Sequence, residues 1–250
     1  MLTTTPFTPQ GDQLRALRLP GSGEEVLYLH GLGCHGAASW AGFAVLRGRP
    51  ALVPDLPGHG RSDRPIDFDY TLPAMADAVA ALLWETGGPP REIVAHSLGG
   101  SIAIHLSERH PELVRRLVLV EPAIDVPEVR ADDIAMAPEE ELEQGGWDRL
   151  LAREIAGRRS EIRLCDPRGF VRCARSLVDH AARRTSMLLT EAAVPIELVV
   201  GEHRRYADQA AYESAGIRTT RLDGAGHFVM HDAPEALLAT VGRAGRGGAR

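Results

Sequence analysis

One serine stands where a nucleophile would be made reactive. Ile93, Val94 and Ala95 form a short apolar run typical of a buried strand, His96 and Ser97 follow, and a helical pattern begins at Leu98. A serine on such a sharp strand-to-helix turn has a strained backbone and an exposed hydroxyl. The turn needs small neighbours two residues to either side, which Ala95 and Gly99 provide. The helix would also point its first backbone N–H groups at the serine, where they could stabilise a negative oxygen. The other interpretation is a glycine-rich connection with an incidental serine.

A nucleophilic serine needs a base, and His227 is placed to act as one. It lies in the short loop Gly224–Phe228, which follows the predicted strand Arg218–Leu222. Histidine is the side chain that most readily accepts a proton near neutral pH. The chain has ten histidines, so the position of His227, rather than its residue type, supports this role.

A second glycine-containing loop could hold the developing negative charge. His30, Gly31 and Gly33 follow the predicted strand Val26–Leu29. Glycines allow backbone N–H groups to turn inward toward a negative oxygen. An ordinary glycine turn is the other interpretation of this segment.

Strands and helices alternate along most of the chain. Short apolar runs bounded by Gly, Pro or Asp are typical of buried parallel strands. They are Val26–Leu29, Ala51–Pro54, Glu92–Ala95, Leu117–Val120, Ile196–Val200 and Arg218–Leu222, with an earlier antiparallel strand at Arg15–Leu19. Helical spacing is present over Leu72–Leu83, Leu98–His110 and Pro234–Val241. The alternation predicts an α/β fold with a mostly parallel sheet between layers of helices.

The alternation stops between Ala123 and Thr190. No clear strand pattern is visible there, but Trp147–Ile155 and Phe170–Val178 have apolar residues at helical spacing. We therefore predict a helical insertion at residues 123–190, within a core made of residues 1–122 and 191–250.

Composition excludes several function classes. The chain has 250 residues, and its 28 basic residues are all Arg, with no Lys and no Asn. The absence of Lys excludes Schiff-base and pyridoxal-phosphate enzymes and a phosphate-loop lysine. The absence of Asn excludes a Cys-His-Asn triad.

Charge and cysteine usage set expectations about partners and location. A formal net charge of −6 gives no reason to expect binding to nucleic acid or to an anionic membrane. Cys34, Cys165 and Cys173 lack zinc-ligand spacing, and we expect no metal and no other cofactor. No secretory signal or membrane span is visible, which favours the cytoplasm. We expect a small-molecule substrate and a monomer or homodimer.

Four motifs together resemble the α/β-hydrolase superfamily, in that family's order and spacing. They are His30-Gly31, the run PDLPGHGRSD from Pro54 to Asp63, His96-Ser97-Leu98-Gly99-Gly100 and Gly224-Ala225-Gly226-His227. The resemblance covers nearly the whole chain outside the predicted insertion. It implies an α/β-hydrolase fold in which residues 123–190 form a cap. It further implies that Ser97 is the nucleophile, that His227 is the general base, and that the backbone N–H groups of Leu32 and Leu98 form the oxyanion hole.

The third member of the triad is where the sequence departs from the family. Such enzymes commonly keep an acid in a Gly-Glu-x-Asp pattern after the strand that is here Ile196–Val200, but this chain has Arg204 in that slot. An arginine cannot accept the imidazole N–H. Glu121 is the first candidate, because it follows the strand Leu117–Val120 and some branches of the superfamily carry their acid there. Asp208 and Glu202 stay open as alternatives, as does a Ser-His dyad without an acid.

The sequence therefore favours a metal-free serine hydrolase that cleaves a carboxylic ester, lactone or thioester through an acyl-enzyme on Ser97. A carbon–carbon bond hydrolase or a biosynthetic cyclase on the same triad is an alternative. A non-catalytic ligand-binding member of the fold is another, supported only by Arg204.

Overall fold

One mixed sheet organises the molecule. The computed structural model describes residues 1–124, 138–156, 160–180, 185–206 and 209–244. Within these residues, eight strands pair in the order β1-β2-β4-β3-β5-β6-β7-β8. Strand β2 pairs antiparallel with both of its neighbours, β1 and β4, and the other neighbouring strands pair parallel. Their bounds are β1 Leu2–Pro6, β2 Gln13–Leu19, β3 Val26–Leu29, β4 Ala51–Asp55, β5 Arg91–His96, β6 Val114–Val120, β7 Ile196–Gly201 and β8 Arg218–Leu222.

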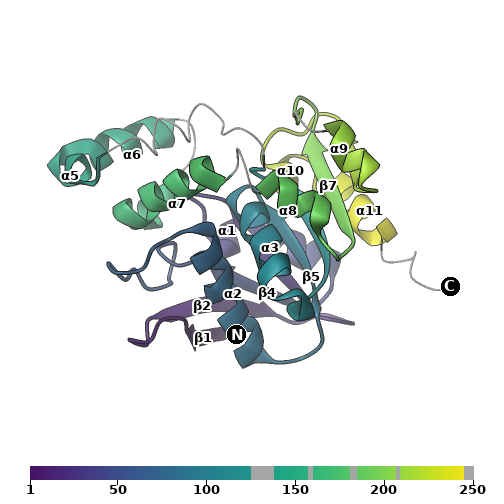
Figure 1. The fold of residues 1–250 in the computed structure, drawn as a ribbon, viewed down its shortest axis with the longest axis horizontal. Helices are drawn as coiled ribbons and strands as arrows, with labels where there is room; N and C mark the ends of the chain where they lie inside the picture. The colour runs from purple at the N-terminus through teal and green to yellow at the C-terminus, as the bar shows by residue number, and fades with distance from the viewer. Residues whose placement is uncertain (125–137, 157–159, 181–184, 207–208, 245–250) are drawn as a thin grey trace.

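Helices cover both faces of this sheet (Figure 1). On one face α1 (Gly36–Arg47), α10 (Val229–Asp232) and α11 (Pro234–Ala244) pack around Trp40 and Phe43. On the other face lie α2 (Leu72–Thr86), α3 (Leu98–Arg109), α8 (Ser186–Glu191) and α9 (Gln209–Ser214), with a 3₁₀ turn at Pro111–Leu113 before β6. The two faces share the central strands, whose successive side chains point to opposite sides. The predicted fold class is confirmed.

The edge strand β1 and helix α1 are among the elements that were not predicted from the sequence, as are the short helices α9 and α10. The edge strand β1 has the sequence LTTTP, and only Thr5 of it is buried. Helix α1 begins after His35, whose Nδ1 accepts a hydrogen bond from the backbone N–H of Ala38 at 3.5 Å. The Trp40 indole donates to the carbonyl of Leu29 at 2.9 Å and is fully buried, so Trp40 is a core residue.

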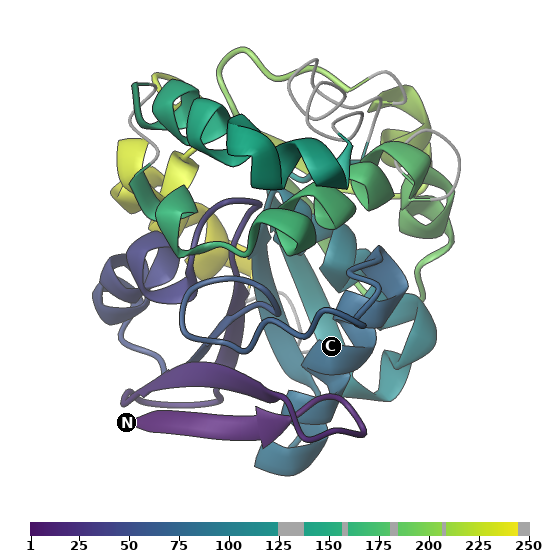
Figure 2. The same ribbon diagram turned by 90° about the vertical axis from the view of Figure 1, so that its left-hand side faces the viewer.

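The described part of the predicted insertion is helical. It contains α5 (Glu139–Glu141), a π-helical turn at Leu142–Gly146, α6 (Trp147–Ala156), a 3₁₀ turn at Ser160–Leu164 and α7 (Pro167–His180). These elements lie above the core, in the upper part of both views (Figures 1 and 2). They share a small apolar cluster of their own, centred on Ile162, Phe170 and Val171, against which Leu32 of the core packs. Residues 125–137, 157–159 and 181–184 of the predicted insertion lie outside the described residues.

No helix in the described ranges is both long enough and apolar enough to cross a lipid bilayer.

Candidate active site

Ser97 occupies a strained turn at the end of a central strand. Its backbone has φ 52° and ψ −119°, between β5 and α3. A residue with a side chain adopts this region only when its surroundings hold it there. Backbone hydrogen bonds do so: the N–H of Ser97 donates to Val120 at 3.1 Å, and its carbonyl accepts from Gly100 at 2.9 Å and Ala123 at 3.3 Å. The turn presents the hydroxyl at the N-terminus of α3.

The loop after β3 runs directly beside this turn. Strands β3 and β5 pair with Leu29 opposite Ala95, so the residues that follow the two strands leave the sheet side by side. A Cβ on Gly31 would lie 3.1 Å from the Ser97 Cβ and 2.9 Å from the His96 ring, so only glycine fits without displacement. Leu32, the next residue, is therefore a close neighbour of the serine.

The α3 side of the turn is packed equally closely. A Cβ on Gly99 would lie 2.7 Å from the carbonyl oxygen of His30. Leu98 is fully buried and opens the helix, where the first backbone N–H groups have no acceptor within the helix. Leu98 directly follows Ser97 and Leu32 directly follows Gly31, so both predicted oxyanion-hole residues lie on the two segments that meet at this turn.

His227 meets a buried carboxylate. Its Nδ1 lies 3.2 Å from Oε2 of Glu121, and the Glu121 side chain is 4% exposed while that of His227 is 34% exposed. The other carboxylate oxygen, Oε1, accepts a hydrogen bond from the backbone N–H of Gly201 at 2.7 Å. An ionised carboxylate can only accept, so Nδ1 carries the proton and Nε2 is left with its lone pair.

The backbone of Glu121 is also unusual. Its φ of 50° lies in the left-handed region, and its N–H donates to the carbonyl of Val199 on β7 at 2.9 Å. Together with the Gly201 contact, this bond ties the end of β6 to the end of β7. Positive φ at a non-glycine residue beside a functional side chain is the kind of strain that surrounding contacts must maintain.

His96 supports His227 from the other side. Its Nε2 lies 2.9 Å from the backbone carbonyl oxygen of His227, and the two ring centroids are 4.6 Å apart. Because a carbonyl oxygen only accepts, Nε2 is the donor. His96 is 1% exposed and immediately precedes Ser97, so one rigid strand end carries the serine and anchors the loop of the histidine. A bond to a backbone carbonyl has no sequence signature, so this role of His96 was not predicted.

Other candidates lie elsewhere. Glu202 is exposed, and its Oε2 accepts from the backbone N–H of Gly224 at 3.0 Å. Asp208 lies outside the described residues. Arg204, in the family's usual acid slot, points its Nη2 at the carbonyl oxygen of Pro122, at 3.3 Å. Within the described residues Ser97 makes no side-chain hydrogen bond to His227; in apo structures such bonds are often long and form fully only with substrate.

The loop from Pro54 to Asp63 has a structural role in attaching to the sheet. His59 is fully buried, and its Nδ1 donates to the carbonyl of Pro57 at 2.9 Å. Asp63 accepts from the backbone N–H of Gln13 at 2.8 Å and pairs with Arg15. Arg61 donates to Asp55. These contacts join the loop to β2 and β4 rather than to Ser97.

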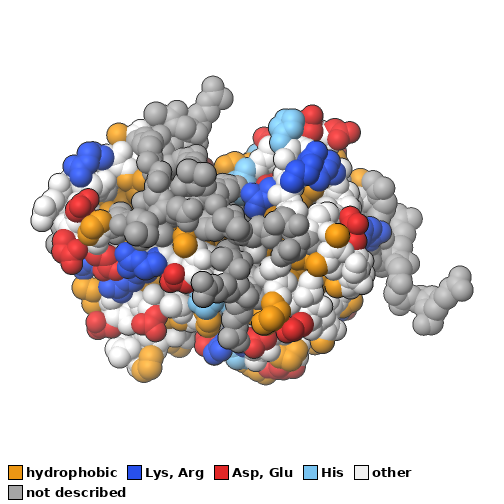
Figure 3. All heavy atoms as spheres, turned by 45° about the horizontal axis from the view of Figure 1, so that its top comes forward, with side chains coloured by type: hydrophobic (Ala, Val, Ile, Leu, Met, Phe, Trp, Pro, Cys, Tyr) orange, Lys and Arg blue, Asp and Glu red, His pale blue; other side chains and the backbone are white. Residues whose placement is uncertain are grey.

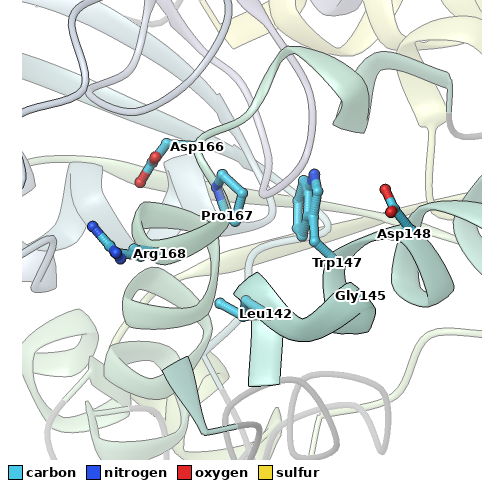
Figure 4. A pocket seen from close by; sticks show the side chains of 7 residues that line it. All are labelled: Leu142, Gly145, Trp147, Asp148, Asp166, Pro167 and Arg168. Atoms are coloured by element: carbon cyan, nitrogen blue, oxygen red, sulfur yellow. The ribbon is translucent and has the colours of Figure 1, made fainter. Parts of the chain in front are cut away.

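The insertion contains a hollow of about 380 Å³. Figure 4 shows Pro167 and Arg168 on one side of it and Trp147 on the other. The remaining lining residues are Leu142, Gly145, Asp148 and Asp166. Trp147 stacks edge-on against the buried ring of Phe170, with centroids 5.5 Å apart, so the hollow borders the apolar cluster that contacts Leu32.

Figure 3 looks toward the top of Figure 1, the side that bears the insertion. Positive and negative side chains are intermixed on the described part of this face. In the described part of the chain, no three His, Cys, Asp or Glu side chains cluster in a way that could hold a metal ion.

The chain belongs to the α/β hydrolase family, whose sequence pattern matches residues 26–240. An uncharacterised protein of Mycobacterium tuberculosis is 31% identical over 266 residues, which covers 92% of this chain and 77% of that protein. An esterase of the same organism is 40% identical over 112 residues, which covers 45% of this chain and 37% of the esterase.

A solved N-acyl homoserine lactonase, complexed with N-butanoyl homoserine, superimposes with a TM-score of 0.77 at 21% identity. The match covers 100% of this chain and 98% of the lactonase, and at this identity it shows the fold alone. The family and its esterase relative support hydrolase activity of the α/β-hydrolase type.

Proposed function

We propose that this protein is a serine hydrolase that cleaves a carboxylic ester, lactone or thioester through an acyl-enzyme on Ser97. The observation that carries the proposal is the contact of 3.2 Å between Glu121 Oε2 and His227 Nδ1, beside a serine held at φ 52°. A buried carboxylate in this position keeps Nε2 of the imidazole available as a base and stabilises the imidazolium that forms.

In the first half of the reaction, Ser97 Oγ attacks the carbonyl carbon of the substrate while its proton passes to His227 Nε2. The carbonyl oxygen becomes an oxyanion, for which the N–H groups of Leu32 and Leu98 are the proposed donors. Collapse of the tetrahedral intermediate breaks the bond to the leaving oxygen or sulfur, which takes the proton from His227.

In the second half, water attacks the acyl-enzyme and gives a proton to His227 Nε2. The acid product leaves, and the proton returns to Ser97 Oγ. The reaction consumes one water for each bond cleaved and needs no metal or redox partner. We take the substrate to be a small molecule, and the hollow beside Trp147 supports a contribution of the insertion to its selectivity.

A fluorophosphonate probe tests the nucleophile without knowledge of the substrate. We expect the wild type to be labelled, and Ser97→Ala to lose labelling and at least about 10³-fold of its turnover of the best ester in a p-nitrophenyl panel. Ser107→Ala is the matched control and should label normally. It removes a buried hydroxyl from α3, the helix that follows Ser97, and that hydroxyl donates to the carbonyl of Ile104 at 2.8 Å.

The outcomes separate the alternatives. Turnover that survives in Ser97→Ala would exclude the serine mechanism. Labelling without turnover of any ester, lactone or thioester would favour the carbon–carbon hydrolase or cyclase. Absence of labelling in folded wild type would favour a ligand-binding protein.

A further inference from the structure

Two side chains from the loop after β7 meet at one backbone carbonyl. The carbonyl oxygen of Pro122 lies 3.3 Å from Arg204 Nη2 and 3.2 Å from the hydroxyl oxygen of Tyr206. A carbonyl oxygen has two lone pairs and can accept both bonds. Tyr206 is buried, and the Arg204 guanidinium carbon lies 4.9 Å from the centroid of its ring, so the two donors also stack on each other.

This loop is itself anchored to the sheet. Nη1 of Arg221, on β8, donates to the carbonyl of Arg204 at 2.6 Å and to those of Gly201 at 3.0 Å and Glu202 at 3.1 Å. Hydrogen bonds from β8 therefore fix the backbone at Arg204. The carbonyl of Pro122 accepts from a loop that is itself fixed to the sheet.

Pro122 directly follows Glu121, the residue whose backbone is strained. Glu121 has φ 50° and must present one carboxylate oxygen to Gly201 and the other to His227. The carbonyl that Arg204 and Tyr206 hold belongs to the peptide between Pro122 and Ala123, whose N–H donates to the carbonyl of Ser97 at 3.3 Å. The proline ring fixes φ of Pro122, so holding this carbonyl restricts the backbone that follows Glu121. A left-handed conformation at a glutamate persists only where neighbouring contacts maintain it.

We propose that Arg204 and Tyr206, the Pro122 clamp, are positioning residues that hold Glu121 in its working conformation. Arg204 stands at the position that usually carries the triad acid in this family. In this protein it stabilises the conformation of Glu121, an acid that follows β6 instead. The inference rests on the proposed function, since it assigns the clamp no role except through Glu121.

The clamp predicts a specific kinetic defect. Tyr206→Phe keeps the ring and its stacking but removes one donor, and we expect the fluorophosphonate labelling rate to fall by about tenfold, with a larger loss when Arg204→Met is added. For p-nitrophenyl butyrate, kcat should fall while KM stays within about twofold, because the clamp does not touch substrate. Arg204→Lys, which retains a donor, should recover part of the Arg204→Met loss.

Tyr212→Phe is the matched control. Tyr212 is also buried, its ring centroid lies 6.0 Å from that of Tyr206, and its hydroxyl is 3.0 Å from Ser186 Oγ, not near Pro122. It removes a comparable buried hydroxyl, so it should lower thermal stability to a similar degree and leave the labelling rate unchanged.

A double-mutant cycle with Glu121→Gln tests whether the Pro122 clamp acts through the carboxylate of Glu121. If the clamp acts through the carboxylate, Tyr206→Phe and Arg204→Met should cause no further loss in the Glu121→Gln background. Equal losses in both backgrounds, a loss no larger than that of Tyr212→Phe, or normal labelling of both clamp variants would overturn the clamp alone. Normal labelling of Glu121→Gln would overturn the acid assignment and the clamp together. If Tyr206→Phe does not fold, the comparison of Arg204→Lys with Arg204→Met in both backgrounds gives the same decision.

Discussion

Glu121 and Gly201 lie at the ends of neighbouring strands, and their contact explains how a carboxylate on β6 can serve a histidine that follows β8. Strands β6 and β7 pair in parallel up to Val120 and Val199, so the residues beyond them leave the sheet at the same edge. Neighbouring strands lie about 5 Å apart, which a glutamate side chain can bridge. A carboxylate that follows β6 can therefore reach the same histidine as a carboxylate that follows β7.

Glu121→Gln should separate the charge of this side chain from its size. We expect kcat to fall by about 10²–10⁴-fold, because the amide cannot stabilise the imidazolium and can favour the wrong tautomer of His227. Glu202→Gln is the control: Glu202 is exposed on the neighbouring loop, and its loss should cost less than about tenfold. Initial rates on one chromogenic ester measure both. A crippled Glu202→Gln beside a nearly normal Glu121→Gln would reverse the assignment.

At the residue scale, the sequence predicted candidate site residues where they lie in recognisable motifs. The surroundings of Ser97 and His227 are motifs, and the Arg at 204 directed attention to Glu121. The bonds from His96 to the carbonyl of His227 and from Tyr206 to that of Pro122 could not be predicted. Their acceptors are backbone oxygens, which every residue has, so no residue type marks them.

At the scale of elements, apolar runs predicted the central strands because both faces of those strands are buried. The same rule missed β1, where three threonines form an edge strand with one face toward solvent. It also missed α1, whose sequence is rich in Ala and Gly and whose buried face depends on Trp40 and Phe43. The register that places Leu29 beside Ala95, and so the loop Gly31–Gly33 beside Ser97, follows from pairing of strands distant in sequence.

The insertion offers a test at the same scale. Trp147 is half-buried at the hollow, whereas Phe170 is fully buried in the apolar cluster of the insertion. Trp147→Ala should change the preference among p-nitrophenyl esters of different acyl length by about tenfold or more, with a small change in stability. Phe170→Ala should instead cost about 3–5 kcal/mol of folding free energy, because it leaves a cavity.

A melting curve and an ester profile for each variant distinguish these roles. Unchanged acyl preference in folded Trp147→Ala would show that the hollow does not shape the substrate site. A Phe170→Ala variant as stable as wild type would mean that the cluster adapts by repacking.

On the scale of the whole molecule, two buried histidines limit the pH range in which the fold is stable. His30 donates from Nδ1 to the carbonyl of Gly31 and accepts at Nε2 from the N–H of Leu56, both at 2.9 Å. A second proton on its ring would break the Leu56 bond. The His59 ring lies 5.3 Å away, and both side chains are inaccessible to solvent. Burial, with a further contribution from His59, lowers the pKa of His30 to about 3, and burial lowers the pKa of His59 to about 4.

These depressed pKa values make stability fall with acid. Between pH 6.5 and about 4 the unfolded chain binds protons on these histidines that the folded chain does not, so the free energy of unfolding decreases as pH falls through that range. For His59 alone, acidification from pH 7 to pH 5 should cost roughly 2 kcal/mol. Ordinary carboxyls stay mostly ionised above pH 5, which keeps their contribution small in this window.

His59→Asn tests this linkage, because the amide can keep the donor to Pro57 but cannot titrate. The variant should be less stable than wild type at pH 7, since it leaves a cavity, yet lose roughly 2 kcal/mol less between pH 7 and pH 5. Urea midpoints and slopes at the two pH values measure the difference, with exposed His203→Asn as a control that should follow the wild type. If wild type and His59→Asn lose equal stability between these pH values, His59 titrates alike in the folded and unfolded chains. The acid sensitivity would then have to come from other groups.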